Sequence, residues 1–313
     1  MTKQKVPFSI DFIKLRGLAF LLSALLVMGA LAITATRGLN FGIDFSGGTL
    51  IEVRLEQTPD LSELRSKLNT LNLGGISIQE FGTAQDLLIR MPEQPGDEAA
   101  QKAAIDSIQS LLNATYDQKV DYRRVEYVGP QVGEELKLQG LYAILFSLAG
   151  IMIYIAFRFE WKFGLAAILA LIHDAVATIG LFAVTQMEFN LSTVAAVLMI
   201  AGYSINDTVI VFDRIRENLR KFKKMPLGDL LNLSINETLS RTIMTSLTTL
   251  LALVSLWFLG GDVIQGFVNA LLFGIIVGTY SSIFVAAPIL LAIGVERRNE
   301  TAAATSEVEK VLR

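Results

Sequence analysis

Residues 191–212 read LSTVAAVLMIAGYSINDTVIVF, an apolar run long enough to cross a bilayer, yet it contains Asp207 beside Asn206. Residues 239–259 form a second such run, with Arg241 near its start. A charge in hydrocarbon costs at least about 3 kcal/mol, so it is kept where it is paired, hydrated or useful. Asp207 lies about 9 Å inside Asp213 at 1.5 Å per residue, and Arg241 has a similar predicted depth. The opposite charges predict either the coupling pair of a proton-driven transporter or a static salt bridge.

The composition is that of a membrane protein. Of the 313 residues, 52% are hydrophobic and 18% are charged, and the mean hydropathy is +0.50. About 20 apolar residues cross the hydrocarbon of a bilayer. Six runs reach that length, at residues 17–36, 138–157, 163–185, 191–212, 239–259 and 264–294. We expect the first to be an uncleaved anchor, because it is long for a signal-peptide core and lacks a small-residue cleavage site. The absence of cysteine excludes disulfides and thiolate metal sites.

Lysine and arginine fall mainly on one side of these spans, which predicts their orientation. The basic residues of that side are Lys3, Lys5, Lys14, Arg16, Arg158, Lys162, Arg214, Arg216, Arg220, Lys221, Lys223, Lys224, Arg297, Arg298, Lys310 and Arg313. The short loops opposite, residues 186–190 and 260–263, contain no lysine or arginine. Short basic loops stay in the cytoplasm. We therefore expect cytoplasmic termini at residues 1–16 and 295–313, an extracytoplasmic segment at 37–137, and five further spans within 138–294.

The extracytoplasmic segment has the pattern of a small α+β domain. The expected elements are a strand at 49–55, a helix capped by Asp60, strands at 76–81 and 86–91 joined by a turn at 82–85, a second helix after a loop at 93–97, and a strand at 121–128. This βαββαβ order predicts a ferredoxin-like fold. Because it contains no histidine, cysteine or nucleophile–base pair, we expect a docking module without catalytic residues, cofactor or metal.

Polar residues recur along one face of two spans. The fifth carries Arg241, Thr245, Thr248, Ala252 and Ser255, and the fourth carries Gly202, Tyr203, Asn206, Asp207, Asp213 and Arg214. Such stripes favour a hydrated seam, with hydroxyls bonded to the preceding helical turn as the alternative. On the third span, His173 and Asp174 lie near mid-membrane, one turn before Thr178. His173 is the only histidine, and both a structural hydrogen bond and a proton relay remain open for this pair.

Small residues recur every four positions along the sixth span. They are Gly266, Ala270, Gly274, Gly278, Ser282 and Ala286. Such a ladder lets another helix backbone approach closely. We expect the contact to lie mainly within this chain, because the spans must close a bundle.

Several short motifs resemble one family. They are GIDFSGGT at residues 42–49, with Gly42, Asp44, Gly47 and Gly48, VGPQVG at 128–133, GYSINDT at 202–208, VFDR at 211–214 and RTIMTS at 241–246. Together they resemble the SecD/SecF family, bacterial auxiliaries of the Sec translocon, from the first anchor to about residue 294. The short extracytoplasmic segment is similar to that of SecF members, since SecD members are larger there.

This resemblance implies half of a twelve-helix set of the resistance–nodulation–division superfamily, completed by SecD in the bacterial plasma (inner) membrane. It implies that the proton-motive force helps to draw exported polypeptide out of SecYEG, with other Sec accessory membrane proteins as further partners beside lipid, and no nucleic acid. The family's proton-path aspartate and arginine match Asp207 and Arg241. Asn206, Asp213, Asp174 and His173 are secondary candidates from the residues themselves.

Three alternatives remain open at this point. The chain could be half of a proton-coupled lipid or small-molecule exporter of the same superfamily, although such exporters carry a larger external domain. It could be a structural scaffold for SecD. An intramembrane aspartyl protease would also place two aspartates, such as Asp174 and Asp207, on separate spans, but Asp207 follows Ser-Ile-Asn rather than Gly-x-Gly.

Overall fold

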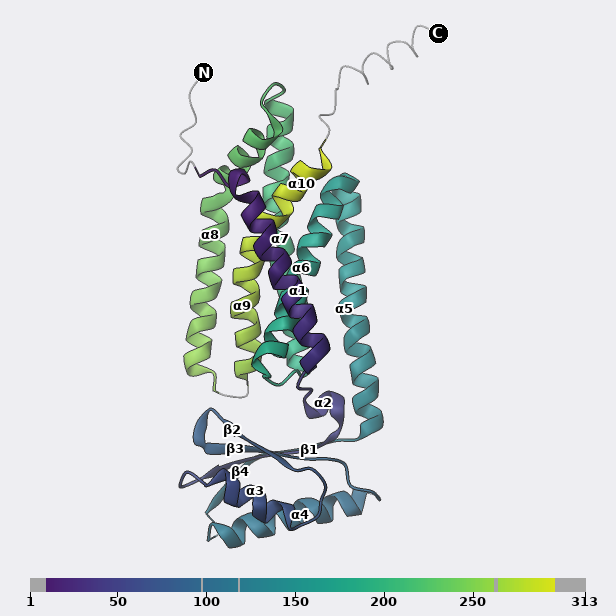
Figure 1. The fold of residues 1–313 in the computed structure, drawn as a ribbon, viewed down its shortest axis with the longest axis vertical. Helices are drawn as coiled ribbons and strands as arrows, with labels where there is room; N and C mark the ends of the chain where they lie inside the picture. Colours follow the sequence, from purple (N-terminus) through teal and green to yellow (C-terminus); the bar gives the residue numbers. More distant parts are fainter. Residues whose placement is uncertain (1–9, 97, 118, 262–263, 296–313) are drawn as a thin grey trace.

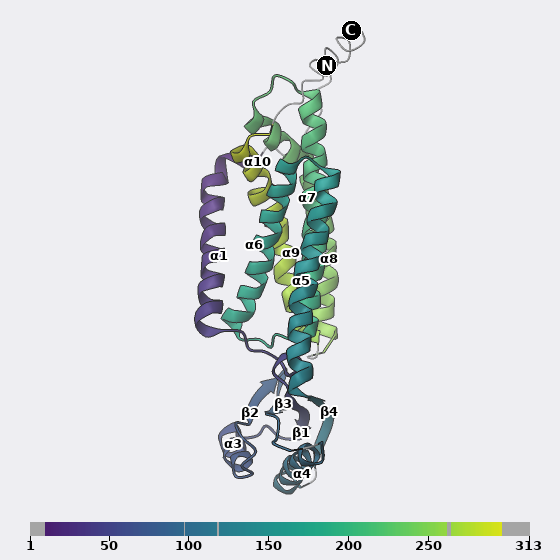
Figure 2. The same cartoon turned by 90° about the vertical axis from the view of Figure 1, so that its right-hand side faces the viewer.

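The computed structural model describes residues 10–96, 98–117, 119–261 and 264–295. It consists of a bundle of long helices with a small sheet domain at one end (Figures 1 and 2). Of the terminal segments expected to be cytoplasmic, residues 1–9 and 296–313 lie outside the described residues.

Six helices in the described residues are long and apolar enough to span a membrane, one for each predicted run. Their bounds are α1 (Arg16–Arg37, preceded by the 3₁₀ turn η1, Ile13–Leu15), α5 (Pro130–Arg158), α6 (Trp161–Thr185), α7 (Leu191–Lys221), α8 (Leu227–Leu259) and a last helix composed of α9 (Gln265–Ser281), the π-helical turn η3 (Ser282–Ala286) and α10 (Ala287–Ile293). The helices α5, α7 and α8 extend well beyond their apolar runs. Hydropathy detects the membrane-buried part of a helix, whereas backbone hydrogen bonding continues into water.

The bundle has an inner layer and an outer one. The helices α6, α7 and α9 bury half or more of their most apolar stretches, whereas α1, α5 and α8 bury less than a fifth. In Figure 2, α6 and α9 lie between α1 on one side and α5 and α8 on the other. The outer helices therefore leave broad apolar surfaces for lipid or for another polypeptide.

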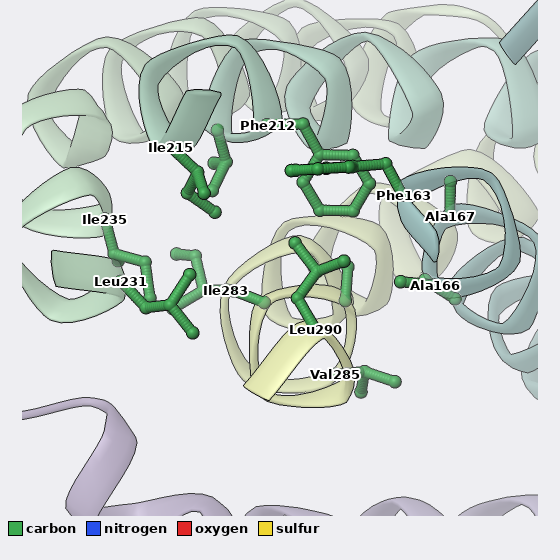
Figure 3. Close-up of a cluster of buried hydrophobic side chains, with 14 of the residues drawn as sticks. Phe163, Ala166, Ala167, Phe212, Ile215, Leu231, Ile235, Ile283, Val285 and Leu290 are labelled. Carbon is green, nitrogen blue, oxygen red and sulfur yellow. The ribbon is translucent and has the colours of Figure 1, made fainter. Parts of the chain in front are cut away.

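The end of the bundle away from the sheet is closed by a cluster of apolar side chains (Figure 3). The rings of Phe163 on α6 and Phe212 on α7 meet edge to face, with centroids 5.2 Å apart. Leu231 and Ile235 of α8 and Leu290 of α10 belong to the same cluster. Because lipid is as apolar as these side chains, close packing rather than the hydrophobic effect stabilises such a contact inside a bilayer.

The sheet domain has the predicted ferredoxin-like topology. Its elements are β1 (Gly48–Leu55), α3 (Leu61–Asn69), β2 (Ser77–Phe81), β3 (Thr83–Met91), α4 (Glu98–Thr115) and β4 (Val120–Val128). The antiparallel strands lie in the order β2-β3-β1-β4. Alternate β1 residues Ile51, Val53 and Leu55 face a core shared with α3 and α4, and the intervening ones face the helix bundle.

Two local predictions in this domain have different outcomes. The Asp60 side chain caps α3, since it accepts hydrogen bonds from the backbone amides of Ser62 (2.8 Å) and Glu63 (3.2 Å). The predicted four-residue turn at 82–85 is wrong, because Phe81 already pairs with Thr83. The hairpin reverses at Gly82, whose φ of +76° is one that glycine adopts without strain.

Candidate functional site

Asp207 lies in the inner layer of the bundle. It is on α7 and only 1% exposed, and both carboxylate oxygens are buried without a hydrogen-bond partner among the described groups. An isolated ionised carboxylate in such a place costs several kcal/mol. The group is therefore the least compensated acidic side chain in the described bundle.

Arg241 acts on this carboxylate from α8. Its charge is close enough to Asp207 to influence the carboxylate electrostatically. Among the described residues, however, no ion pair with a nitrogen–oxygen distance of 4.0 Å or less joins the two side chains. Arg241 itself is exposed on the outer side of α8. The structure thus brings the predicted pair into the same region without a direct contact.

The polar stripe of α8 faces outward with Arg241. The side chains of Thr248 and Ser255 are exposed and donate to the carbonyls of Met244 and Leu251, both at 2.9 Å. The predicted seam is therefore not enclosed within the described part of the chain. These hydroxyls donate hydrogen bonds to backbone carbonyls of the preceding helical turn, as the alternative interpretation predicts.

The secondary candidates on α7 separate from Asp207. Asn206 is exposed, because adjacent residues on a helix point about 100° apart, at 3.6 residues per turn. Asp213 accepts from Arg158 of α5 at 3.0 Å, in a half-exposed ion pair near the end of α7. The structure therefore does not place these two beside the buried carboxylate.

The His173–Asp174 pair of α6 is the centre of a buried hydrogen-bond network. The imidazole Nδ1 lies 2.9 Å from Asp174 Oδ1, and Asp174 Oδ2 accepts from the hydroxyls of Ser204 (2.5 Å) and Ser281 (2.8 Å). His173 Nε2 is buried and has no partner among the described groups. Thr178 donates to the backbone carbonyl of Asp174, not to its carboxylate. The network joins α6, α7 and α9.

A second pair of hydroxyls continues this polar layer. Thr208 on α7 and Ser282 at the start of η3 lie 2.9 Å apart, and Ser282 also contacts the Ser204 carbonyl at 3.4 Å. Ser204 and Thr208 flank Asp207 on α7, so the buried acid lies within the same layer. Sequence reasoning missed Ser204 and Ser281, because single serines in apolar helices are common and only their spatial meeting distinguishes them.

The glycine ladder of the last helix is a packing face over part of its length. A Cβ on Gly274 would collide with Ile200 of α7, and one on Gly278 would lie 3.0 Å from Ser204 Cβ. Nothing lies within 4 Å of such an atom at Gly266. The ladder therefore brings α9 against α7 beside the polar layer, and its first member does not take part.

The glycine motif at residues 42–48 connects the sheet domain to the bundle. The helical turn α2 (Ile43–Ser46) follows Gly42, whose backbone amide donates to the Phe189 carbonyl at 3.0 Å. The Asp44 carboxylate accepts from the backbone amide of Leu191, the first residue of α7, at 3.0 Å. Arg90 of β3 pairs with Glu188 in the same loop. The motif thereby ties the sheet to the start of the helix that carries Asp207.

Gly47 and Gly48 make the turn from α2 into β1. Their φ values are +69° and +104°, and a Cβ on Gly48 would lie 2.6 Å from the Met91 carbonyl oxygen. Only glycine fits such a position. The backbone of this turn thus requires glycine.

Residues 107–296 match the family described as protein export membrane protein SecD/SecF, C-terminal, and residues 32–59 match the SecD/SecF GG motif. The chain belongs to the SecD/SecF family. This confirms the resemblance, and the fold class predicted from the sequence is confirmed as well.

Relatives within the SecD/SecF family cover nearly the whole chain. The protein translocase subunit SecF of Rickettsia bellii is 49% identical over 286 residues, which are 91% of this chain and 93% of that protein. The subunit of the same name from Desulfurispirillum indicum is 49% identical over 287 residues, 91% of each. This member of the SecD/SecF family is a multi-pass membrane protein with a Sec-associated transport role.

Two solved SecDF structures share the fold. SecDF from Thermus thermophilus, described as a translocon-associated membrane protein, is 38% identical with a TM-score of 0.83, over 92% of this chain and 39% of that one. A super-membrane-facing form of SecDF is 37% identical with a TM-score of 0.65, over 97% and 40%. The SecD/SecF family member described here thus spans about two fifths of those chains.

Proposed function

We propose that this chain is the SecF subunit of a protein translocase in the bacterial plasma membrane. It works with a SecD-type partner and uses the proton-motive force to promote late steps of protein export through a SecYEG channel. Asp207 binds the proton and Arg241 is its charge partner. Both termini are cytoplasmic, and the sheet domain is extracytoplasmic.

The burial of the Asp207 carboxyl group is the observation that supports this proposal most directly. A carboxyl group that is 1% exposed and makes no hydrogen bond is far more stable with a proton than as an anion. Arg241 influences it from an exposed position on α8 without an ion pair. A small rotation of α8 that brings the guanidinium closer stabilises the anion and releases the proton, whereas withdrawal favours its uptake.

The available energy is sufficient for a conformational step. One elementary charge that crosses 100 mV supplies about 2.3 kcal/mol. That amount changes a two-state equilibrium by roughly fifty-fold, since about 1.4 kcal/mol corresponds to a factor of ten. The α7 helix runs from the buried acid to the loop held by Asp44, so its movement reaches the sheet domain directly.

The relatives and the outer surface support a SecD-type partner. The solved SecDF chains are more than twice as long as the segment that this chain matches. Arg241 and the hydroxyls of Thr248 and Ser255 lie on an outer helix face that is exposed in the described structure. A second set of helices against α8 encloses this polar face.

Substitution of Asp207 tests the proposal. Asp207→Asn keeps the shape and cannot change its charge, so export stimulated by a proton gradient should be lost while the complex still assembles. Arg241→Lys should also reduce this export, because the planar guanidinium is lost, and Asp207→Glu should retain part of it. The measurement is gradient-dependent export into membrane vesicles at equal levels of complex.

Two controls separate this proposal from a static salt bridge. Asp213→Asn removes a half-exposed ion pair, whose free energy is about 0–1 kcal/mol, so export should stay normal. For a static bridge, Asp207→Asn would destabilise the bundle and the Asp207→Asn, Arg241→Gln double variant would restore export. Full gradient-dependent export by Asp207→Asn would refute the proposal. Co-purification of SecD-type and SecYEG-type proteins separates a translocase from an exporter.

A further inference from the structure

The His173–Asp174 pair is buried as deeply as Asp207, and the mechanism above does not use it. His173 is 5% exposed and Asp174 is 0% exposed. Both lie in α6, one of the inner helices. A buried ionisable group is costly to keep inside a membrane, which makes such a group a candidate for a functional role.

The neighbours of the pair do not neutralise the negative charge of the Asp174 carboxylate. With a neutral imidazole, the pair carries a net charge of −1, and its neighbours Ser204 and Ser281 supply only hydroxyl donors. Charged residues of α1 and α5 lie near the helix ends, and α9, η3 and α10 contain none. On α7 the nearest ionisable groups along the helix from Ser204 are the phenol of Tyr203 and the acid Asp207, and Tyr280 of α9 lies with its ring centroid 6.2 Å from the imidazole centroid. One added proton makes the pair neutral.

The geometry identifies the atom that accepts this proton. Nδ1 lies 2.9 Å from the Asp174 carboxylate, which fixes its hydrogen on that side of the ring. Nε2 is then left with a free lone pair, and it is buried without a partner in the described structure. Where a carboxylate holds Nδ1–H in this way, Nε2 is the nitrogen that exchanges protons and the carboxylate stabilises the imidazolium.

We propose that His173 Nε2 is a second proton-binding site within the bundle, with Asp174 as its positioning residue. Water that enters the polar layer delivers the proton and later takes it back. The Nε2–H bond forms as an O–H bond of a hydronium ion breaks, which leaves water, and the reverse transfer releases the proton; the net charge of the pair changes from −1 to 0 on proton uptake. The link to export rests on the proposed function, whereas the proton-binding site itself can be tested without it.

Proton binding at this site changes contacts that hold α7 and α9. The Asp174 carboxylate accepts from the imidazole on one oxygen and from two serines on the other. When the imidazole becomes cationic, it draws the carboxylate charge toward itself and weakens the bonds to Ser204 and Ser281. Ser204 lies one helical turn before Asp207. The two proton sites are therefore connected through α7.

A spectroscopic test uses the fact that the chain has a single histidine. The protein is labelled with ¹⁵N-histidine, purified with an affinity tag free of histidine, and placed in lipid bilayers. Nitrogen NMR then reports one imidazole. We expect Nδ1 to carry hydrogen throughout and Nε2 to gain one reversibly as the pH is lowered stepwise. An Nε2 that stays unprotonated at every pH at which the protein remains folded, or that carries the hydrogen at every pH, would overturn the proposal.

Variants connect the site to function and separate its failure from that of Asp207. Asp174→Asn should abolish the reversible Nε2 titration, and His173→Gln should remove gradient-dependent export at equal complex levels. Tyr280→Phe keeps the neighbouring ring and should leave the titration unchanged. In Asp207→Asn, the Nε2 titration should persist although export is lost, so a failure at Asp207 leaves this test intact. A His173→Gln protein with normal thermal stability and full gradient-dependent export would contradict the role in coupling.

Discussion

The Asp86 carboxylate shows how one residue can hold a sheet together. It is 1% exposed, and Arg54 of the neighbouring strand donates to both of its oxygens, at 2.7 and 2.5 Å. Thr83 adds a third bond at 2.7 Å. These bonds outweigh the desolvation of the carboxylate, so they hold the pKa of Asp86 below its ordinary value of 3.8. The ionised form is therefore favoured by folding.

The pKa shift predicts a pH-dependent stability of the strands β1 and β3. A depressed folded-state pKa contributes stability above the unfolded value near 3.8, and this contribution is lost as the pH falls through the folded value. Asp86→Asn should therefore weaken hydrogen-exchange protection of these strands at pH 7 by about 1–3 kcal/mol. The difference from the native protein should shrink when stability is measured near pH 3. A difference that is equal at both pH values would show that Arg54 does not recognise the charge of Asp86.

For single residues, the sequence reveals which side chains are chemically unusual more readily than it reveals which side chains they contact. Asp207 stands out because charge is rare in an apolar run, and its burial agrees with that inference. Its neighbour Asn206 looks equally unusual but is exposed, since helix rotation decides which of two adjacent residues faces inward. The serines that bind Asp174 have no such signature. Their role depends on the packing of three helices, which no local pattern encodes.

The pairing of α7 with α9 is the clearest packing device among the elements. Gly274 and Gly278 place the backbone of α9 against Ile200 and Ser204. Larger side chains at these positions would force the two inner helices apart. In a bilayer the loss is one of packing and interhelical hydrogen bonds, because lipid solvates the separated apolar faces.

The glycine ladder therefore makes a position-specific prediction. Gly274→Leu and Gly278→Leu should each lower the free energy of unfolding of the purified protein by about 1–3 kcal/mol, because the larger side chain overpacks the helix contact. The melting temperature and the recovery of the complex should both fall. Gly266→Leu is the matched control, since a Cβ there meets nothing within 4 Å, and it should leave stability unchanged. Equal tolerance of all three substitutions would show that close approach of the backbones is not what these glycines provide.

The elements themselves were largely predictable, and their ends were not. Six apolar runs indicated six helices, and alternation with one cap indicated the βαββαβ order. The α8 helix, however, begins at Leu227, twelve residues before its apolar run. That extension contains polar residues such as Asn232 and Asn236, which donate to or accept from the segment before α1. Hydropathy cannot detect a helix whose stability comes from such contacts.

The whole molecule exposes both apolar side chains and an arginine on its outer helices. The outer helices α1, α5 and α8 expose large apolar side chains, among them Leu25, Phe146 and Leu251, each more than half exposed. Lipid covers such residues in any membrane protein. An exposed Arg241 on a membrane helix is different, because hydrocarbon does not solvate it. The proposed SecD-type partner would cover this polar face of α8.

The basic residues predict the orientation of this unit in the membrane, which would decide from which side protons reach the proposed site at Asp207. The sheet domain and the loop between α7 and α8 lie at opposite ends of the bundle (Figure 1). The chain has no cysteine, so single cysteines report without background. A cysteine at Glu93, an exposed position after β3, should react with an impermeant maleimide in cells with a permeabilised outer envelope, whereas one at Lys224 should react only after the membrane is opened. Lysine and arginine in short loops predict this result. The reverse labelling pattern would place the basic loop outside and would contradict the proposed orientation.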